Sequence, residues 1–460
     1  MIEWITDHLA VLMFFVLTFI MFVGYPVAFV LGAIGIFFGL LGVYFGVFSL
    51  IQFANLMPRV YGTAVENQVL VAVPMFVFMG TMLEKSRVAE DLLFCLQVLL
   101  RRVPGGLAMA VTILGTIMAA TTGIVGASVI MLTLIALPVM LNGNYNKEMS
   151  VGTIASAGTL GILIPPSIML VIMGDLLQIP VGTLFIGAVI PGLVMSTTYL
   201  VYIFIRCSLN PALAPALDAS IGPQTTAELW ALVLKSFAPP AFLIFLVLGS
   251  IFLGWATPTE AAGVGCAGAI ILALVNRRLS LKTMFDVIES SALTNAMVFF
   301  IIFGATLFSY VFRALGGDDV VHEILVKMGI DTGVEILVFT MVLIFVMGFF
   351  FDWIEICLVV IPIFGPILMK ADFGGIVPNG QIAVLWFAIL MAVNMQTAFL
   401  TPPFGFALFY MKGTVPPSVT MGHIYRGIIP FVLLQLIALG FCIAYPQIVL
   451  WLPKYMGFLD

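Results

Sequence analysis

Long apolar runs separated by short polar segments make up most of the sequence. A helix that crosses the hydrocarbon core of a bilayer needs about 20 mainly apolar residues. Ten segments meet this requirement and are predicted to cross the membrane: 7–23, 26–48, 66–84, 150–176, 183–206, 229–254, 258–275, 284–312, 380–411 and 424–451. The pattern therefore predicts an all-α polytopic membrane protein.

Two further apolar stretches, 105–141 and 333–370, are each long enough for two short helices. Polar or glycine-containing sequence interrupts both at the centre, TTGIVGAS at 121–128 and GFFFDWIE at 348–355. We interpret each stretch as a re-entrant helical hairpin that enters and leaves the membrane on one face.

Charged residues make up only 8% of the chain, against roughly 25% in soluble globular proteins. This composition excludes an ordinary soluble enzyme, a nucleic-acid binder and a disordered scaffold. The five cysteines lie far apart without CxxC spacing, so they are predicted to be small buried apolar side chains. Three histidines cannot form a His-rich metal centre.

Lysine and arginine orient the chain, because they gather in cytoplasmic loops. With the N-terminus outside, most of them lie in the inner loops: Lys85, Arg87, Arg101, Arg102, Lys147, Arg206, Arg277, Arg278, Lys282, Lys412 and Arg426. The outer positions are Arg59, Arg313, Lys327, Lys370 and Lys454, while Lys235 lies near an interface. A hairpin that crossed fully would weaken this bias. Both termini are therefore predicted to lie outside.

The two halves of the chain repeat one order of segments around a polar linker at 207–224. Pro26 corresponds to Pro258, and Pro165–Pro166 corresponds to Pro402–Pro403. The first repeat, 1–206, comprises scaffold helices in 7–84, a surface arm 86–102, the hairpin 105–141, a broken helix 150–176 and a closing helix 183–206. The second, 225–460, comprises scaffold helices in 229–312, an outer arm 316–332, the hairpin 333–370, a broken helix 380–411 and a closing helix 424–451. The hairpins enter from opposite faces, which predicts the inverted-topology repeats of secondary transporters.

The proline pairs break two of the predicted crossings, because proline lacks an N–H and clashes with the preceding turn. Carbonyl groups freed in this way are tolerated in a membrane only when they are buried in protein or line a cavity. Carbonyl and hydroxyl oxygens there can coordinate a small hard cation, and the N-termini of the half-helices attract an anion. The alternative is a kinked helix whose polar groups bond to a neighbour.

Several segments resemble the large membrane subunit of TRAP (tripartite ATP-independent periplasmic) transporters. They are GTLGILIPPSIMLVIMG at 158–174, ATPTEAAGVG at 256–265, NMQTAFLTPPFGFALFYMKG at 394–413, TTGIVGASV at 121–129 and DWIEICLVVIPIFGPIL at 352–368. The resemblance covers essentially the whole chain. The first hairpin tip departs from the Ser-Gly-Ser type sequence often found in relatives and is most similar to the branch labelled mannitol/chloroaromatic.

The resemblance implies an elevator-type, sodium-coupled importer of organic acids in the bacterial inner membrane. It also implies two partners, a small TRAP membrane subunit and a periplasmic substrate-binding protein. No cofactor is expected beyond Na⁺ as the coupling ion. The phosphate-binding pattern GxxxxGK[ST] does not occur, which favours ion-driven over ATP-driven transport.

The hairpin tips and broken helices supply the expected site. Sodium-binding residues are expected to be Thr121, Thr122, Gly123, Gly126, Ser128, Gly158, Thr159, Asp352, Thr397, Thr401 and Gly405. Residues expected to line the path of the solute are Pro165, Pro166, Ser167, Asn394, Gln396, Pro402 and Pro403. At the first tip, the alternative is a turn of small residues that serves only tight packing.

Charged residues near the spans have structural explanations as well. Asp352 and Glu355 have the spacing of a capping box, and Asp352 is equally consistent with a functional intramembrane carboxylate. Glu260, three residues after Thr257, is predicted to cap its helix.

The charge of an imported anion has no obvious partner in the sequence. Arg59 and Arg313 are outward-facing candidates, but we interpret them as interfacial anchors. Asp175 is expected at the solvated outer end of its helix.

Other functions fit the sequence less well. A channel needs no second broken helix in each chain, and an intramembrane enzyme needs a catalytic set within the spans. His8, His322 and His423 lie near span ends or in loops, and Asp352 has no aspartate partner within a span. A self-sufficient ion-coupled carboxylate carrier is the alternative within the transporter class, and a proton could replace sodium.

Overall fold

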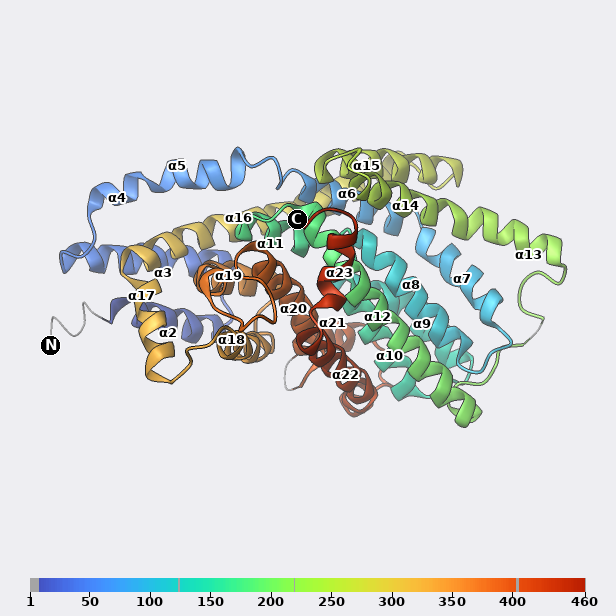
Figure 1. The fold of residues 1–460 in the computed structure, drawn as a ribbon. Helices are drawn as coiled ribbons and strands as arrows, with labels where there is room; N and C mark the ends of the chain where they lie inside the picture. Colours follow the sequence, from blue (N-terminus) through green and yellow to red (C-terminus); the bar gives the residue numbers. More distant parts are fainter. Residues whose placement is uncertain (1–7, 123–124, 219, 403–404, 460) are drawn as a thin grey trace.

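The computed structural model describes residues 8–122, 125–218, 220–402 and 405–459. Within these ranges every regular element is a helix, and the helices form an elongated body (Figure 1). Nine helices of the described part are long and apolar enough to cross a membrane: Val27–Tyr44, Val125–Asn142, Val181–Leu209, Thr226–Phe252, Pro258–Val275, Leu281–Ala314, Trp353–Lys370, Gln381–Leu400 and Met421–Ala444. The predicted all-α polytopic architecture is confirmed.

One group of helices runs along the length of the body, and we call it the scaffold (Figure 1). It consists of α2 (Leu9–Phe22), α3 (Val27–Tyr44), α6 (Ala72–Lys85), α14 (Ala238–Phe252), α15 (Pro258–Val275) and α16 (Leu281–Ala314). α16 packs along α3 and α6, α2 packs on α3, and α15 packs between α6 and α14. α14 is preceded by α13 (Thr226–Leu232) and the π-helix η4 (Val233–Phe237).

The hairpins and broken helices form a second group, which we call the core block. The first half contributes α8 (Gly106–Thr122), α9 (Val125–Asn142), α10 (Lys147–Thr159), η2 (Leu160–Ile162) and α11 (Ile168–Leu177). The second half contributes α18 (Gly333–Met347), α19 (Trp353–Lys370), α20 (Gln381–Leu400) and α21 (Phe406–Thr414). The arms are α7 (Val88–Leu100) and α17 (Gly317–Lys327), and the closing helices are α12 (Val181–Leu209), α22 (Met421–Ala444) and α23 (Gln447–Tyr455).

Capping residues start these helices where the sequence predicts. Thr257 Oγ1 accepts from Glu260 N, and Glu260 Oε2 accepts from Thr257 N at 2.8 Å, which completes a capping box at the start of α15. The same exchange between Asp352 and Glu355 starts α19. All five cysteines are free and buried, as predicted.

The segment between α3 and α6 differs from the sequence interpretation, which placed no element there. It contains three short helices, α4 (Leu50–Ala54), α5 (Leu56–Val60) and the π-helix η1 (Tyr61–Val65). Ser49 N donates to Gln52 Oε1 at 2.7 Å in the capping box that starts α4. That box was a detectable signal, but helices of five residues are too short for a periodic pattern to reveal.

The closing segment 424–451 was predicted as one helix and is two, because Pro446 has no N–H to donate to Cys442 O. α22 therefore ends at Ala444, and α23 begins at Gln447. The freed Cys442 carbonyl accepts instead from Trp386 Nε1 of α20 at 3.0 Å. Trp386 is 1% exposed, so it is a buried hydrogen-bond donor rather than part of an interfacial belt.

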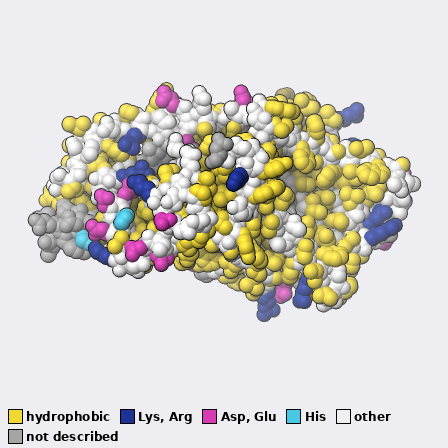
Figure 2. Space-filling view, viewed as in Figure 1, with side chains coloured by type: hydrophobic (Ala, Val, Ile, Leu, Met, Phe, Trp, Pro, Cys, Tyr) yellow, Lys and Arg dark blue, Asp and Glu magenta, His cyan; other side chains and the backbone are white. Residues whose placement is uncertain are grey.

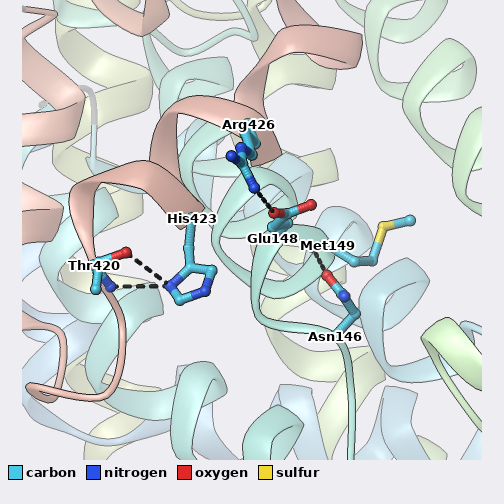
Figure 3. Close-up of polar contacts among 6 residues, drawn as sticks. All are labelled: Asn146, Glu148, Met149, Thr420, His423 and Arg426. Atoms are coloured by element: carbon cyan, nitrogen blue, oxygen red, sulfur yellow. Dashed lines mark hydrogen bonds and ion pairs between the residues drawn. The ribbon is translucent and has the colours of Figure 1, made fainter.

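Helices from the two halves begin side by side, as Figure 3 shows for α10 of the core block and the closing helix α22. Arg426 Nη1 of α22 lies 3.7 Å from Glu148 Oε1 of α10. Asn146 caps α10, and His423 Nδ1 accepts from Thr420 N at 3.1 Å at the start of α22. Both helices thus start on one face of the body, as the predicted topology requires.

The contact between α10 and α22 depends on two glycines. A Cβ atom on Gly152 would lie 2.1 Å from the carbonyl oxygen of Gly427, and one on Gly427 would lie 2.2 Å from Glu148 O. Because backbone rather than a flexible side chain occupies this space, the two helices can approach so closely only without side chains.

Gly152→Ala is expected to lower the free energy of unfolding by about 1–3 kcal/mol, because the added methyl overlaps the facing backbone. The thermal unfolding midpoint of the purified protein measures this effect. Gly249→Ala in α14 is the matched control, since no atom lies within 4 Å of its Cβ position. Equal midpoints for the two variants would contradict the close approach.

Candidate functional site

Each hairpin contacts the broken helices of both halves of the chain. The first hairpin contacts α10 of its own broken helix through α8 and α9, and through α9 it also contacts α21 of the other half. The second hairpin contacts its own α20 through α18 and α19, and through α19 it also contacts α11 of the first half. α10 and η2 in turn contact α20. The segments predicted to form the site are therefore brought together.

The break in the first broken helix lies in the interior, between η2 and α11. Pro165, Pro166 and Ser167 are all buried, and Ser167 Oγ donates to Ile162 O at 2.7 Å. Ile162 is the residue whose carbonyl would accept from position 166 in a continuous helix, so the serine hydroxyl replaces the N–H that Pro166 lacks. Ser167 thus supports the break.

The last turn of α10 carries two more predicted residues. Thr159 is fully buried and donates from Oγ1 to Ser156 O at 3.0 Å, which leaves its oxygen lone pairs available. Gly158 is needed for packing, because a Cβ there would lie 2.5 Å from Cγ2 of Val129 in α9.

The second broken helix carries the corresponding hydroxyls and amides. Thr401 Oγ1 donates to Thr397 O at 2.7 Å, while its N–H has shifted to Ala398 O at 3.1 Å. Thr397 Oγ1 donates to Val393 O, and Asn394 Nδ2 donates across to Met341 O of α18 at 2.6 Å. Asn394 therefore ties the second hairpin to the broken helix.

Gln396 is the exception in this segment. Its side chain is 0% exposed, and neither its Oε1 nor its Nε2 has a hydrogen-bond partner among the described residues. A buried amide without partners costs about 1–3 kcal/mol, so its presence beside a helix break favours a ligand that completes it.

The first hairpin tip is described only in part. Gly123 lies outside the described residues, and the side chains of Thr121 and Thr122 at the end of α8 lie outside them as well. Gly126 is buried against α21, where an added Cβ would lie 2.8 Å from the ring of Tyr410. Ser128 is 3% exposed and faces the interior.

At the second tip, the capping interpretation is confirmed. Asp352 Oδ1 accepts from Trp353 N at 2.8 Å, and Glu355 Oε2 accepts from Asp352 N at 2.9 Å. Glu355 is 8% exposed and Trp353 1%. Since backbone N–H groups already engage both carboxylates, their first role is to start α19.

After the second break, α21 begins beside Gly405, which has φ +26°. A Cβ there would lie 2.8 Å from Phe399 O, so glycine allows the chain to turn against the end of α20. Pro402 is exposed, and Pro403 lies outside the described residues.

Two polar clefts lie where the scaffold meets the core block. The first, which we call the arginine cleft, is a cavity of about 230 Å³ lined by Arg59, Thr63, Thr306, Tyr310 and Arg313 on the scaffold side and by Asp175, Gln178, Leu358 and Pro362 on the core-block side. Arg59 and Arg313 were interpreted from the sequence as interfacial anchors, and the structure instead brings them together. Sequence reasoning could not detect this, because the residues belong to α5 and α16.

The second cleft, which we call the Lys85 cleft, measures about 200 Å³ and lies near the other end of α16. Thr81, Glu84 and Lys85 of α6 and Ser290 and Thr294 of α16 line it, together with Ala127 of the first hairpin tip. Nearby on α16, the Ser291 and Asn295 side-chain oxygens are buried without a partner in the described part. The predicted site is thus adjacent to a polar opening.

The surface agrees with a chain embedded in lipid. Figure 2 shows hydrophobic side chains over most of this face, while charged side chains gather toward the end where α17 lies. Exposed apolar residues such as Phe245, Trp255 and Ile271 lie on α14, on α15 and between them.

Comparison with known proteins finds a matching family model and several similar proteins. The family model described as Tripartite ATP-independent periplasmic transporter, DctM component, matches residues 11–448. The chain is 30% identical over 412 residues to the C4-dicarboxylate TRAP transporter large permease protein DctM of Pseudomonas aeruginosa, which covers 89% of this chain and 92% of that protein. It is 28% identical over 383 residues to the isethionate TRAP transporter permease protein DctMQ of Oleidesulfovibrio alaskensis. This match covers 82% of this chain and 57% of that protein.

A solved structure shares the fold. It is the Alcanivorax borkumensis YdaH transporter, described as having an unusual topology, with a TM-score of 0.60 and 88% of each chain covered. Because the two sequences are only 16% identical, this likeness extends to the fold alone.

Gln396→Leu is expected to raise the free energy of unfolding by about 1–3 kcal/mol in the absence of ligands, because it removes a buried amide that has no partner. Gln435 is the comparison, since only its Oε1 is buried without a partner among the described residues, whereas Gln396 lacks partners for both amide atoms. Gln435 Nε2 donates to the hydroxyl of Tyr199 at 2.6 Å, so Gln435→Leu leaves that buried hydroxyl unpaired and should destabilise the protein. Thermal unfolding checks both, and a loss of stability in Gln396→Leu would show that the amide is satisfied.

Proposed function

The chain belongs to the DctM component family of tripartite ATP-independent periplasmic transporters, and on that premise we propose that it imports an organic acid, driven by a sodium gradient. The relatives are named as transporter permease proteins, so the chain is a transporter subunit and not an enzyme. The resemblance drawn from the sequence is confirmed at this level, while the mannitol/chloroaromatic branch stays a prediction.

The observation that carries the proposal is that each hairpin contacts the broken helix of its own half and also that of the other half. The first break lies in the interior, and the second follows directly after the buried α20. Backbone carbonyls at a break are tolerated in a membrane when they are shielded from lipid. Such discontinuous helices form the ion and solute sites of secondary transporters. A channel needs no pair of breaks, so this arrangement favours a carrier.

Sodium as the coupling ion is supported by the chemistry of the site. Thr159, Thr397 and Thr401 use their hydroxyl hydrogens on backbone carbonyls, so their oxygens point lone pairs elsewhere. Neutral oxygens of this kind suit a small hard cation better than a proton. The proposed sodium ligands therefore come from both broken helices and from the first hairpin tip.

The solute class follows from the relatives. One is named for C4-dicarboxylates and the other for isethionate, so both names refer to small organic anions. We extend that class to this chain, with Asn394, Gln396 and Ser167 near the solute. The unpaired amide of Gln396 is suited to hydrogen-bond an acidic group.

The proposed partners are a small membrane subunit and a periplasmic substrate-binding protein, in the inner membrane of a bacterium. The chain covers 57% of the DctMQ relative, so that protein carries further sequence in the same chain. A small membrane subunit is proposed to assemble with the residues of this chain. The core block is proposed to move as an elevator against the scaffold, with two inverted repeats and both termini periplasmic.

Transport tests the proposal as a whole. In liposomes that contain the chain with its small subunit, labelled succinate or isethionate should accumulate saturably, with a sodium gradient and the binding protein both required. Uptake without the binding protein and the small subunit would indicate a self-sufficient carrier, and non-saturating flux would indicate a channel. Failure to accumulate either anion would contradict the proposed solute class.

Sodium binding is tested separately by thermal unfolding in NaCl, KCl and choline chloride at equal ionic strength. A ligand that binds only the folded state raises the midpoint by mass action. Thr401→Ala should weaken the sodium response roughly tenfold, equivalent to about 1.4 kcal/mol, because it removes one oxygen ligand. Thr414→Ala, at the end of α21, is the control. Identical curves in all three salts would favour proton coupling.

A further inference from the structure

The arginine cleft lies outside the segments to which the proposed function assigns ions and solute. Its wall on the scaffold side belongs to α5, η1 and α16, and its wall on the core-block side belongs to α11 and α19. Both arginines are on the scaffold side, whereas the carboxylate of Asp175 is on the core block. With two guanidinium groups and one carboxylate in its lining, the cleft has a formal charge of 2 − 1 = +1.

Arg59 is held in place by an aromatic ring. Its Cζ lies 4.5 Å from the ring centroid of Tyr310, and the Tyr310 hydroxyl donates to Gln52 O at 3.1 Å. Stacking on the ring leaves the N–H edge of the guanidinium without a partner among the described residues. A planar, always charged group in this position is suited to a bidentate bond with a carboxylate or sulfonate.

Arg313 of the scaffold forms a hydrogen bond to the core block. Its Nη2 donates to Pro362 O of α19 at 2.8 Å. That carbonyl is available because Pro366, one turn further along α19, has no N–H to donate to it. The other neighbour of Arg313, Asp318, lies at 3.9 Å with both side chains about half exposed, so this ion pair is weak.

A second bond crosses the same boundary. Asn67, which precedes α6, donates from Nδ2 to Asp175 Oδ1 at 2.5 Å. Asp175 was expected at a solvated helix end, and it is instead half-buried and hydrogen-bonded. The arginine cleft is therefore spanned by two polar bonds that must break if the core block moves against the scaffold.

We propose that the arginine cleft is a binding site for the solute as an organic carboxylate or sulfonate, with its acidic group paired to Arg59 and Arg313. The solute takes Arg313 from the neutral Pro362 carbonyl, since a carboxylate or sulfonate offers the guanidinium both an opposite charge and a bidentate pair of acceptor oxygens. Binding then releases one of the two bonds between core block and scaffold. This inference rests on the proposed function of the chain as an importer of organic anions.

The test is the thermal unfolding midpoint of the purified complex in succinate or isethionate, compared with KCl at equal ionic strength. At least one anion should raise the midpoint of the wild type. Arg313→Gln and Arg59→Gln should each weaken the apparent affinity roughly tenfold, because one charged pair is lost. Asp175→Asn should strengthen it, since it removes a like charge, and this opposite sign cannot come from a general loss of stability.

Lys370→Gln is the matched control, because it removes a cation from an exposed position at the end of α19, outside the cleft. It should leave the affinity unchanged. Wild-type affinity in both arginine variants, or no response of the wild type to either anion, would overturn the proposal. Stabilisation by phosphatidylglycerol but by neither anion would assign the arginines to a lipid headgroup and overturn it as well.

Uptake in liposomes separates this inference from the proposed function. If the wild type imports an anion with sodium and Arg313→Gln keeps the wild-type KM, the proposal that the arginine cleft binds the solute is wrong. The proposed function as an importer then still holds. If the wild type imports neither anion, the proposed function itself fails. A KM that rises in Arg313→Gln and recovers partly in Arg313→Lys is the expected result, since lysine restores the charge without the bidentate geometry.

Discussion

The constraint on which the structure depends is the backbone carbonyl that a proline leaves without its N–H. In a membrane such a group costs several kcal/mol unless another donor reaches it. Three side chains meet this need at three prolines: Ser167 donates to Ile162 O, Trp386 to Cys442 O and Arg313 to Pro362 O. Each carbonyl lies four residues before a proline, at Pro166, Pro446 and Pro366 respectively. The breaks are therefore stable because donors at the right places satisfy them.

The three hydrogen bonds differ in whether the proposed movement of the core block against the scaffold would break them. Ser167 acts within its own segment, and Trp386 of α20 reaches the end of α22, which packs against it. Those two bonds stay within one packed unit. Arg313 extends from the scaffold to the core block, so its bond alone among the three spans the boundary where relative movement is proposed. Arg313 is also the charged donor among the three, so an anion can pair with its guanidinium bidentately in place of the carbonyl. All three bonds satisfy a carbonyl that a proline leaves without its N–H. Two of them hold a helix break in place, and the third is a contact that a bound anion can replace.

Much of the architecture follows from local sequence, and much of the site does not. Apolar run length predicts the helices, the proline pairs predict the breaks, and the spacing of Thr257 with Glu260 and of Asp352 with Glu355 predicts two helix starts that the structure confirms. The contacts that bring the site together join residues far apart in the chain, such as Asn67 with Asp175. No periodicity encodes such a pairing. Sequence reasoning accordingly found Arg59 and Arg313 as isolated cations and missed the cavity between them.

α16 gives the two clefts a common wall and sets the distance between them. Thr294 lines the Lys85 cleft and Thr306 lines the arginine cleft, and twelve residues of helix separate them by about 18 Å. A bilayer core is about 30 Å thick, so the two openings together shorten the apolar path considerably. Val298 and Ile301, both buried, lie in the interval between the openings. Ala127 of the first hairpin tip lines the Lys85 cleft, so that tip borders the cleft. At the arginine cleft, Arg313 and Asn67 bond across the boundary between scaffold and core block. In the proposed elevator movement, the core block would pass this apolar band along α16, and the polar bonds at the arginine cleft would break.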